Sequence, residues 1–278
     1  MKILLTGANG FVGNKVRELL SKDHEVISLV RRPGLPEGEI LLDLSDEAAV
    51  ARAIEQKMIP DCGVVIHLAS VTATPDSIHD LSILFRNATI AKSTALIARQ
   101  INAAKLIHVS SMAVYPQTDG LFSEDARVDP SVNNDCIYGL SKFNAEVLLN
   151  FFLQRSNIQI SHLRMAIVYG EGMPDSRIIP VMRKELEEAH TITVFGDGER
   201  LINQIEVNKA ARVIRVFAEE DHPGTFNIGD ECLSMEALAI SINVGGKGRI
   251  VKKPEGKKTR FVLDLSKMRS RIGDVYRD

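Results

Sequence analysis

Short apolar runs alternate with longer segments of helical spacing over residues 1–170. The apolar runs, whose lengths are typical of buried strands, cover residues 2–6, 24–30, 39–44, 63–69, 105–109 and 158–169. Longer segments with apolar residues three or four positions apart cover residues 11–20, 78–104 and 137–154. Strands that alternate with helices in this way predict an α/β fold with a doubly wound parallel sheet of the Rossmann type.

The pattern changes after residue 170, where glycines and prolines cluster and the elements become shorter. Here the spacing predicts helices over 178–189, 208–219 and 234–244, and strands near 204–207 and 224–228. We therefore expect a dinucleotide-binding domain over residues 1–169, to which the chain returns at about 204–228. The remainder of residues 170–278 would form a smaller α/β substrate lobe. Open parallel sheets bind ligands beyond the carboxyl ends of their strands, where the two parts would meet.

A glycine-rich turn joins the first predicted strand to the first predicted helix. Gly7 can adopt a tight turn, Gly10 lets the backbone approach a pyrophosphate, and Gly13 lets the helix lie close to the sheet. The unpaired N–H groups and positive dipole end of that helix would then face the phosphates. The cofactor contacts predicted in this turn are Gly7, Asn9, Gly10, Phe11, Val12 and Gly13.

The end of the second strand bears on which dinucleotide binds. An NAD site usually has an acidic residue there, which accepts hydrogen bonds from the ribose 2′-hydroxyl. Here Val30 is followed by Arg31 and Arg32, whose guanidinium groups can bind a 2′-phosphate. NADP(H) is therefore favoured, with NAD(H) possible; the alternative is that both arginines are solvated loop residues.

Other strand ends supply further predicted cofactor contacts. These are Asp43, Leu44, Leu68, Ala69 and Ser70. Asp43 either lies near the adenine or caps its own loop. Ala69 and Ser70 are small, so a ligand could lie against the carboxyl end of their strand.

Tyr138 and Lys142 lie four residues apart, on one face of a predicted helix. A tyrosine has an ordinary pKa of about 10, which a neighbouring ammonium and an oxidised nicotinamide would lower. Ser111 ends a strand at the same edge, where its hydroxyl could polarise a substrate carbonyl. Asn87 could hold a water that relays protons to Lys142. The alternative is that this tyrosine and lysine share surface spacing by chance.

The composition excludes several classes of function. The chain is 45% hydrophobic and 25% charged, with a net charge of −2. This charge balance does not favour binding to nucleic acid or to anionic membranes. No apolar run is long enough to span a bilayer. The three cysteines are widely spaced, and no His/Cys/acid cluster has metal spacing, so we expect no metal and a cytoplasmic protein. His67 and His162 fall within buried strands and are interpreted as core residues.

These motifs together resemble extended short-chain dehydrogenase/reductases of the NAD(P)-dependent epimerase/dehydratase type. The segments that carry the resemblance are TGANGFVG (6–13), HLAS (67–70), VSSMAVY (109–115), YGLSK (138–142), LRMAIVYG (163–170), VFGDGER (194–200) and FNIGD (226–230). The resemblance implies a tetrad, formed by Asn87, Ser111, Tyr138 and Lys142, that moves a hydride between nicotinamide and a carbon of a nucleotide sugar. It also implies a homodimer built on the helices that contain Asn87 and Tyr138.

Positions at which this chain differs from the family pattern restrict the reactions that we expect it to catalyse. Family dehydratases carry an Asp-Glu pair after the catalytic hydroxyl, where this chain has Met112 and Ala113. A 4,6-dehydratase is therefore not expected, and 4-epimerisation or 4-keto reduction is favoured.

The family's Arg-Asp pair beyond the GDG turn, which commonly helps to hold the substrate diphosphate, is replaced by Ile202 and Asn203. Arg164, Arg177 and Arg200 remain as candidate anion contacts. The substrate contacts predicted are Ser111, Met112, Arg164 and Arg200. Two other functions stay open, namely reduction of a non-sugar carbonyl and a non-catalytic NADP(H)-binding sensor or assembly factor.

Overall fold

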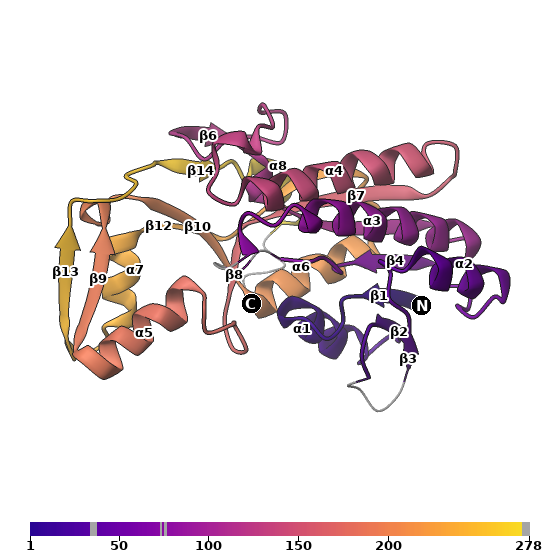
Figure 1. Cartoon of the computed structure of the whole chain (residues 1–278), viewed down its shortest axis with the longest axis horizontal. Helices are drawn as coiled ribbons and strands as arrows, with labels where there is room; N and C mark the ends of the chain where they lie inside the picture. The colour runs from indigo at the N-terminus through magenta and orange to yellow at the C-terminus, as the bar shows by residue number, and fades with distance from the viewer. Residues whose placement is uncertain (34–37, 73, 75–76, 274–278) are drawn as a thin grey trace.

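The computed structural model describes residues 1–33, 38–72, 74 and 77–273 (Figure 1). A seven-stranded sheet lies at its centre, and every neighbouring pair in this sheet is parallel. Its strands in spatial order are β11 (Gly224–Ile228), β7 (Gln159–Met165), β5 (Lys105–Ser111), β4 (Val64–His67), β1 (Lys2–Thr6), β2 (Glu25–Val30) and β3 (Glu39–Leu41). The predicted doubly wound parallel sheet is confirmed.

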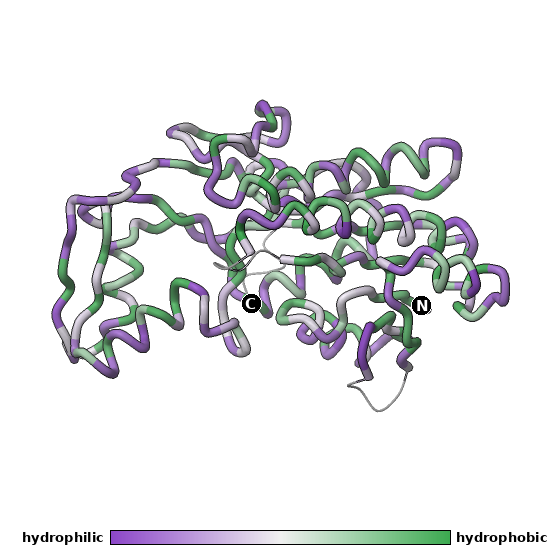
Figure 2. Tube along the Cα trace, viewed as in Figure 1, coloured by the Kyte–Doolittle hydropathy of each residue, from purple (hydrophilic) through white to green (hydrophobic). Residues whose placement is uncertain are grey.

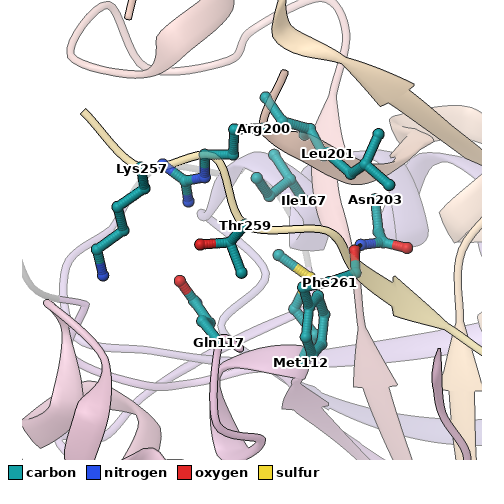
Figure 3. Close-up of a pocket in the computed structure, with 10 residues that line it drawn as sticks. Met112, Gln117, Ile167, Arg200, Leu201, Asn203, Lys257, Thr259 and Phe261 are labelled. Carbon is teal, nitrogen blue, oxygen red and sulfur yellow. Dashed lines mark hydrogen bonds between the residues drawn. The ribbon is translucent and has the colours of Figure 1, made fainter. Parts of the chain in front are cut away.

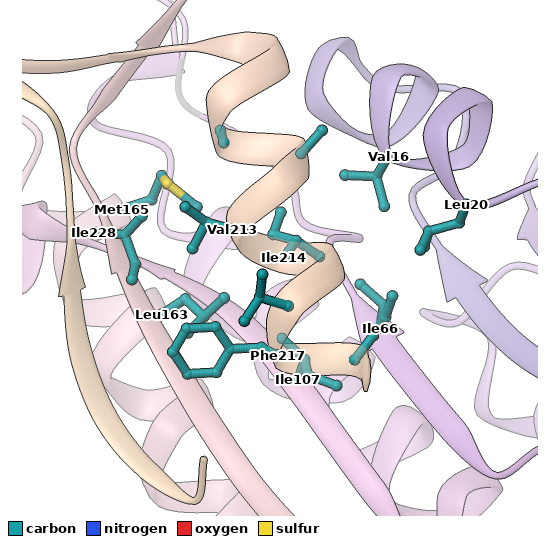
Figure 4. Close-up of a cluster of buried hydrophobic side chains, with 14 of the residues drawn as sticks. Val16, Leu20, Ile66, Ile107, Leu163, Met165, Val213, Ile214, Phe217 and Ile228 are labelled. Carbon is teal, nitrogen blue, oxygen red and sulfur yellow. The ribbon is translucent and has the colours of Figure 1, made fainter. Parts of the chain in front are cut away.

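Helices cover both faces of this sheet. On one face, α1 (Phe11–Leu20) and α6 (Val207–Glu219) pack together, and α8 (Ser266–Ile272) completes their hydrophobic core. Figure 4 shows Val16 of α1 and Phe217 of α6 directed into this core. On the other face lie α2 (Glu47–Glu55), α3 (Ser82–Gln100) and α4 (Cys136–Leu153), which share a second core. Hydropathy alternates along these helices, as expected when only one side of a helix is buried (Figure 2).

The second lobe has its own hydrophobic core. It contains α5 (Ile178–Ala189) and α7 (Met235–Ile242), beside the paired strands β9 (Thr191–Phe195) and β13 (Arg249–Lys253). A three-stranded sheet of β12 (Glu231–Ser234), β10 (Leu201–Glu206) and β8 (Ile167–Tyr169) connects this lobe to the main sheet. The contact Lys15–Glu171, at 3.3 Å, joins α1 to the loop after β8. The lobe therefore adjoins the glycine turn.

The predicted strand over 158–169 is two strands in the structure. The backbone N–H of Ala166 donates to the carbonyl of Ile228, and the chain then leaves β7 and pairs as β8 with β10. The break lets one apolar run serve two sheets. Before α2, Asp46 caps the helix by accepting from the N–H of Ala49. The neighbouring Ser45 donates to Asp43 instead.

Candidate active site

The glycine turn depends on two close backbone approaches. Gly7 has a φ of +76°, and a Cβ there would lie 2.7 Å from the backbone nitrogen of Ala69 at the end of β4. A Cβ on Gly13 would lie 2.0 Å from the carbonyl oxygen of Gly7. Any side chain at these two positions would push the turn away from β4 or α1 away from the turn. The geometry is that of a backbone cradle held at the carboxyl end of the sheet.

The N-terminus of α1 opens onto this cradle. Its N-cap, Gly10, has no side chain to cap the helix, so the first N–H groups are left for an anionic ligand. The amide of Asn9 donates to the carbonyl of Arg32 at 3.2 Å, which ties the turn to the end of β2. Arg31 and Arg32 are both exposed there. The half-buried Phe11 and Val12 begin the helix, and Phe11 packs against the core of the second lobe.

The remaining predicted cofactor residues lie at neighbouring strand ends. Leu68, Ala69 and Ser70 are half-buried after β4, and the N–H of Ala69 donates to the hydroxyl of Thr6 at 3.2 Å. Asp43 accepts from the N–H and hydroxyl of Ser45, at 2.8 and 2.7 Å, so it caps its own loop. These bonds lower the pKa of Asp43, although burial opposes them. Leu44 is buried in the core shared by α2 and α3.

Ser111 and Tyr138 are brought together where α4 packs on the turn after β5. That turn, η2 (Met112–Val114), is held by the N–H of Ala113, which donates to the hydroxyl of Ser111 at 3.1 Å. A Cβ on Gly139 would lie 2.2 Å from the carbonyl oxygen of Ala113, so the glycine permits this close approach. Tyr138 directly precedes this glycine, and its phenol lies close enough to the hydroxyl of Ser111 for that group to lower the phenol's pKa.

The electrostatics of the tyrosine differ from the expected pattern. Burial raises the pKa of Tyr138, while the charge of Arg177 and the hydrogen bond from Ser111 lower it. Burial also lowers the pKa of Lys142 to about 8, opposed by the carboxylate of Glu146 one turn further along α4. The protein groups together therefore raise the pKa of the phenol, and the charge of Arg177 opposes this rise. An additional positive charge, such as that of an oxidised nicotinamide, would lower the pKa of the phenol.

The side chain of Asn87 holds three segments of the chain together through hydrogen bonds. Its side-chain oxygen accepts from the N–H of Val71 at 2.7 Å, and its amide donates to the Val71 carbonyl and to the hydroxyl of Ser141. These bonds tie α3, the loop after β4 and α4 together next to Lys142. Both amide protons are thereby used, so a water at this position would have to donate to an oxygen of Asn87.

The structure corrects the predicted role of Arg164. Its side chain is buried, with Nη2 2.8 Å and Nε 3.1 Å from the two carboxylate oxygens of Glu146. Nη1 donates to the hydroxyl of Tyr115 and to the carbonyl of Glu124. Arg164 therefore pairs with a buried carboxylate below the site and is not a substrate contact. Sequence reasoning missed Glu146, although its position four residues after Lys142 placed it on the same helix face.

Three histidines form a buried row beneath α3 and α4. His67, His108 and His162 are directly in register across β4, β5 and β7. His67 shares a hydrogen bond of 2.8 Å with Thr6, and His162 shares one of 3.1 Å with His108. Burial lowers the pKa of His67 to about 3 and that of His162 to about 4, so both rings are neutral. The interpretation of His67 and His162 as core residues is confirmed.

A pocket lies between η2 and the second lobe (Figure 3). Met112 and Arg200, both predicted substrate contacts, line it together. Its lining also includes Gln117, Ile167, Leu201, Ile202, Asn203, Lys257, Thr259 and Phe261. Because Met112 directly follows Ser111, the pocket adjoins the Ser111–Tyr138 pair.

A glycine cradle at the carboxyl end of a parallel sheet, with Ser111, Tyr138 and Lys142 beside it, defines a dinucleotide-dependent enzyme class. Residues 3–229 match the model of the NAD dependent epimerase/dehydratase family. The chain belongs to this family.

Several known proteins are similar to the chain. It is 28% identical to an L-arabinose 1-dehydrogenase (NAD(P)(+)) of Haloferax volcanii, over 59% of this chain and 66% of that protein, just under two thirds of the relative. It is 25% identical to the uncharacterized UDP-glucose epimerase YtcB of Bacillus subtilis, over 89% of this chain and 83% of the relative. Enzymes named dTDP-glucose 4,6-dehydratase are also among the relatives. Family membership therefore does not exclude a dehydratase.

A solved structure agrees over nearly the whole chain. MoeE5 in complex with UDP-glucose and NAD is 25% identical, with a TM-score of 0.81, and the match covers 98% of this chain and 92% of that one. Over the described residues, no helix is long and apolar enough to cross a membrane. The same residues contain no group of three or more His, Cys, Asp or Glu side chains that could hold a metal ion.

Proposed function

We propose that the protein transfers a hydride between a nicotinamide cofactor and a nucleotide sugar, with Tyr138 as the acid/base. The observation that carries the proposal is the packing of α4 on η2, which sets Tyr138 against Ser111 beside the glycine cradle. In this reaction Ser111 donates a hydrogen bond to the substrate oxygen. Tyr138 gives up or takes the proton on that oxygen while the hydride moves on carbon. Lys142 helps to orient the cofactor and supplies positive charge.

Within the family, we favour 4-keto reduction or 4-epimerisation over dehydration. Removal of water needs an additional acid and base close to the sugar. The residues after Ser111 are Met112 and Ala113, whose thioether and methyl groups can transfer no proton. Assay of the purified protein with dTDP-glucose and UDP-glucose tests this choice, and accumulation of a 4-keto-6-deoxy sugar would contradict it.

For the cofactor, we propose a preference for NADP(H). Arg31 and Arg32 are exposed at the end of β2, where the amide of Asn9 donates to the carbonyl of Arg32. Val30 occupies the position at which an NAD site usually has a carboxylate. A known similar structure binds NAD, so the two cofactors must be compared directly. Native mass spectrometry of the purified protein is the test. Retained NAD(H) supports an epimerase, which keeps its cofactor, whereas empty protein that takes up NADPH supports a reductase.

We also propose that the protein is a homodimer through α3 and α4. These helices expose large apolar side chains, with Phe85 66%, Val147 49% and Phe151 60% exposed. Such residues on adjacent helices form a surface that favours association. Replacement of Phe85 and Phe151 by Glu should convert a dimer into a monomer in sedimentation experiments. A wild-type chain that is monomeric at micromolar concentration would contradict the proposal.

The experiment that tests the proposed reaction is the replacement Tyr138→Phe. It keeps the ring and removes the transferable proton, so turnover should fall by about 100- to 10,000-fold while cofactor affinity is retained. A Phe variant with full activity would contradict the role of Tyr138.

A further inference from the structure

Two buried histidines beneath α4 form a chain of hydrogen bonds that reaches the surface. His108 on β5 and His162 on β7 are directly in register, and their Nδ1 atoms lie 3.1 Å apart. Nε2 of His162 lies 3.2 Å from Oδ1 of Asn150 on α4. His108 is 0% and His162 3% exposed, whereas Asn150 is exposed. The chain therefore leads from the interior of the protein to solvent.

The acceptor at the surface determines where each proton of this chain lies. Both rings are neutral, because burial lowers the pKa of His162 to about 4 and that of His108 well below its ordinary value. The carbonyl oxygen of Asn150 can only accept, so Nε2 of His162 carries a hydrogen and its Nδ1 is bare. That bare nitrogen accepts from Nδ1 of His108, which leaves Nε2 of His108 without a hydrogen. The chain thus has a proton acceptor at its inner end and a proton donor at its outer end.

The inner end of the chain lies close to Lys142. Among the residues that the structure describes, Nε2 of His108 has no hydrogen-bond partner, although a buried nitrogen normally has one. After burial, the charge of Lys142 is the largest influence that lowers the pKa of His108, ahead of either neighbouring histidine. Lys142 is 4% exposed, and burial lowers its pKa to about 8, so it can gain or lose a proton near neutral pH. A buried water between the ammonium and the bare nitrogen would satisfy both groups.

Asn87 has no proton to pass to a water beside Lys142. Its amide hydrogens are donated to the carbonyl of Val71 and the hydroxyl of Ser141, and its oxygen accepts from the N–H of Val71. A water there could bind only to that oxygen, so a proton on Lys142 needs a further route to solvent. The histidine chain is a route that ends at the surface.

We propose that His108 and His162 conduct the proton of the reaction between Lys142 and solvent. This inference rests on the proposed function, which releases one proton for each hydride that leaves a sugar. When a sugar is oxidised, the proton lost through Tyr138 reaches Lys142, and a bridging water delivers a proton to Nε2 of His108. The Nδ1 proton of His108 passes to Nδ1 of His162, whose Nε2 proton leaves to a solvent water beside Asn150. One proton enters and one leaves, no electron moves along the chain, and reduction of a sugar runs the same steps in reverse.

Simultaneous measurement of the hydride and the proton tests this path. Full-length protein saturated with oxidised cofactor is mixed, in weak buffer, with the UDP- or dTDP-sugar that it oxidises fastest. The absorbance of reduced nicotinamide reports the hydride, and a pH indicator reports the proton released to solvent. Cofactor affinity and thermal unfolding of each variant are measured alongside.

The variant His108→Gln keeps a side chain that forms hydrogen bonds but does not relay a proton. Proton release should therefore slow about tenfold or more, while the first hydride transfer keeps the wild-type rate. His162→Gly should show the same delay, and added imidazole, which can occupy the space of the lost ring, should remove it. Gln154→Leu is the matched control, since this amide is exposed one turn after Asn150, and it should release the proton as fast as the wild type.

Different results separate the inference from the proposed function. Proton release at the wild-type rate in both His108→Gln and His162→Gly overturns the path and leaves the reaction intact. A delay that imidazole does not remove, or equal slowing of the hydride and the proton, also overturns it, because altered packing would then explain the effect. Wild-type protein that forms no reduced cofactor with any of these sugars contradicts the proposed function itself, and with it this path.

Discussion

The replacement Gly139→Ala should disable catalysis by moving two elements apart. The added Cβ would lie 2.2 Å from the carbonyl oxygen of Ala113 and 2.8 Å from the Cβ of Pro130, where ordinary contacts begin near 3.4 Å. Relief of these overlaps requires α4 and η2 to separate by about 1 Å, and a misplacement of about 1 Å can cost about 100-fold in rate. Overpacking costs about 1–3 kcal/mol, which the higher helix propensity of alanine partly offsets by about 1 kcal/mol. The variant should therefore fold and bind cofactor but turn over about 100-fold more slowly.

The assay follows oxidation of the reduced nicotinamide with the best nucleotide sugar of a panel, alongside cofactor affinity and thermal unfolding. Gly63→Ala is the matched control, because nothing lies within 4 Å of the Cβ that it would add. The control should retain wild-type activity. If Gly139→Ala turns over at the wild-type rate, the packing of α4 on η2 does not set the catalytic geometry.

Three further predictions concern the cofactor, the core and pH. Joint replacement of Arg31 and Arg32 by Ala should weaken NADPH binding about 10- to 100-fold in titrations and leave NADH binding unchanged. Equal losses of affinity for both cofactors would refute the contact with the 2′-phosphate. Arg164→Met should lower the free energy of unfolding in urea by about 3–5 kcal/mol, because it leaves the buried carboxylate of Glu146 without its partner. A second replacement, Glu146→Leu, should recover much of that loss. No recovery would contradict the pairing of Arg164 with Glu146. Histidines such as His67 stay neutral in the folded protein but take up a proton in the unfolded chain below about pH 6.5, so stability should be full above that pH and fall below it. A melting temperature that is constant from about pH 7 to pH 5 would contradict this.

Much of the fold could be predicted because its strands and helices have strong local patterns. The helix Ile178–Ala189 and the strand Gly224–Ile228 have the boundaries that the spacing predicts. The strand Arg249–Lys253 was not predicted, since its residues are mostly exposed and its partner β9 is distant in the chain. Its stability depends on a pairing that local hydrophobicity does not encode.

The site could be predicted where chemistry follows from residue type and helix spacing, as for Tyr138 and Lys142. The role of a residue could not be predicted where a contact with a residue distant in the chain determines it. Arg164 was expected to meet an anion, but Glu146 on α4 pairs with it inside the core. Likewise, only the tertiary arrangement distinguishes Lys257, which lines the pocket, from Lys258, which pairs with two acids.

The most direct test of the central claim is a single-turnover measurement of hydride transfer. Protein saturated with oxidised cofactor is mixed with UDP- and dTDP-sugars, and the absorbance of reduced nicotinamide is followed. The account predicts that the wild type forms reduced cofactor with at least one of these sugars, and that Tyr138→Phe forms it at least about 100-fold more slowly. No reduced cofactor with any of them, or equal rates in the two proteins, would contradict it.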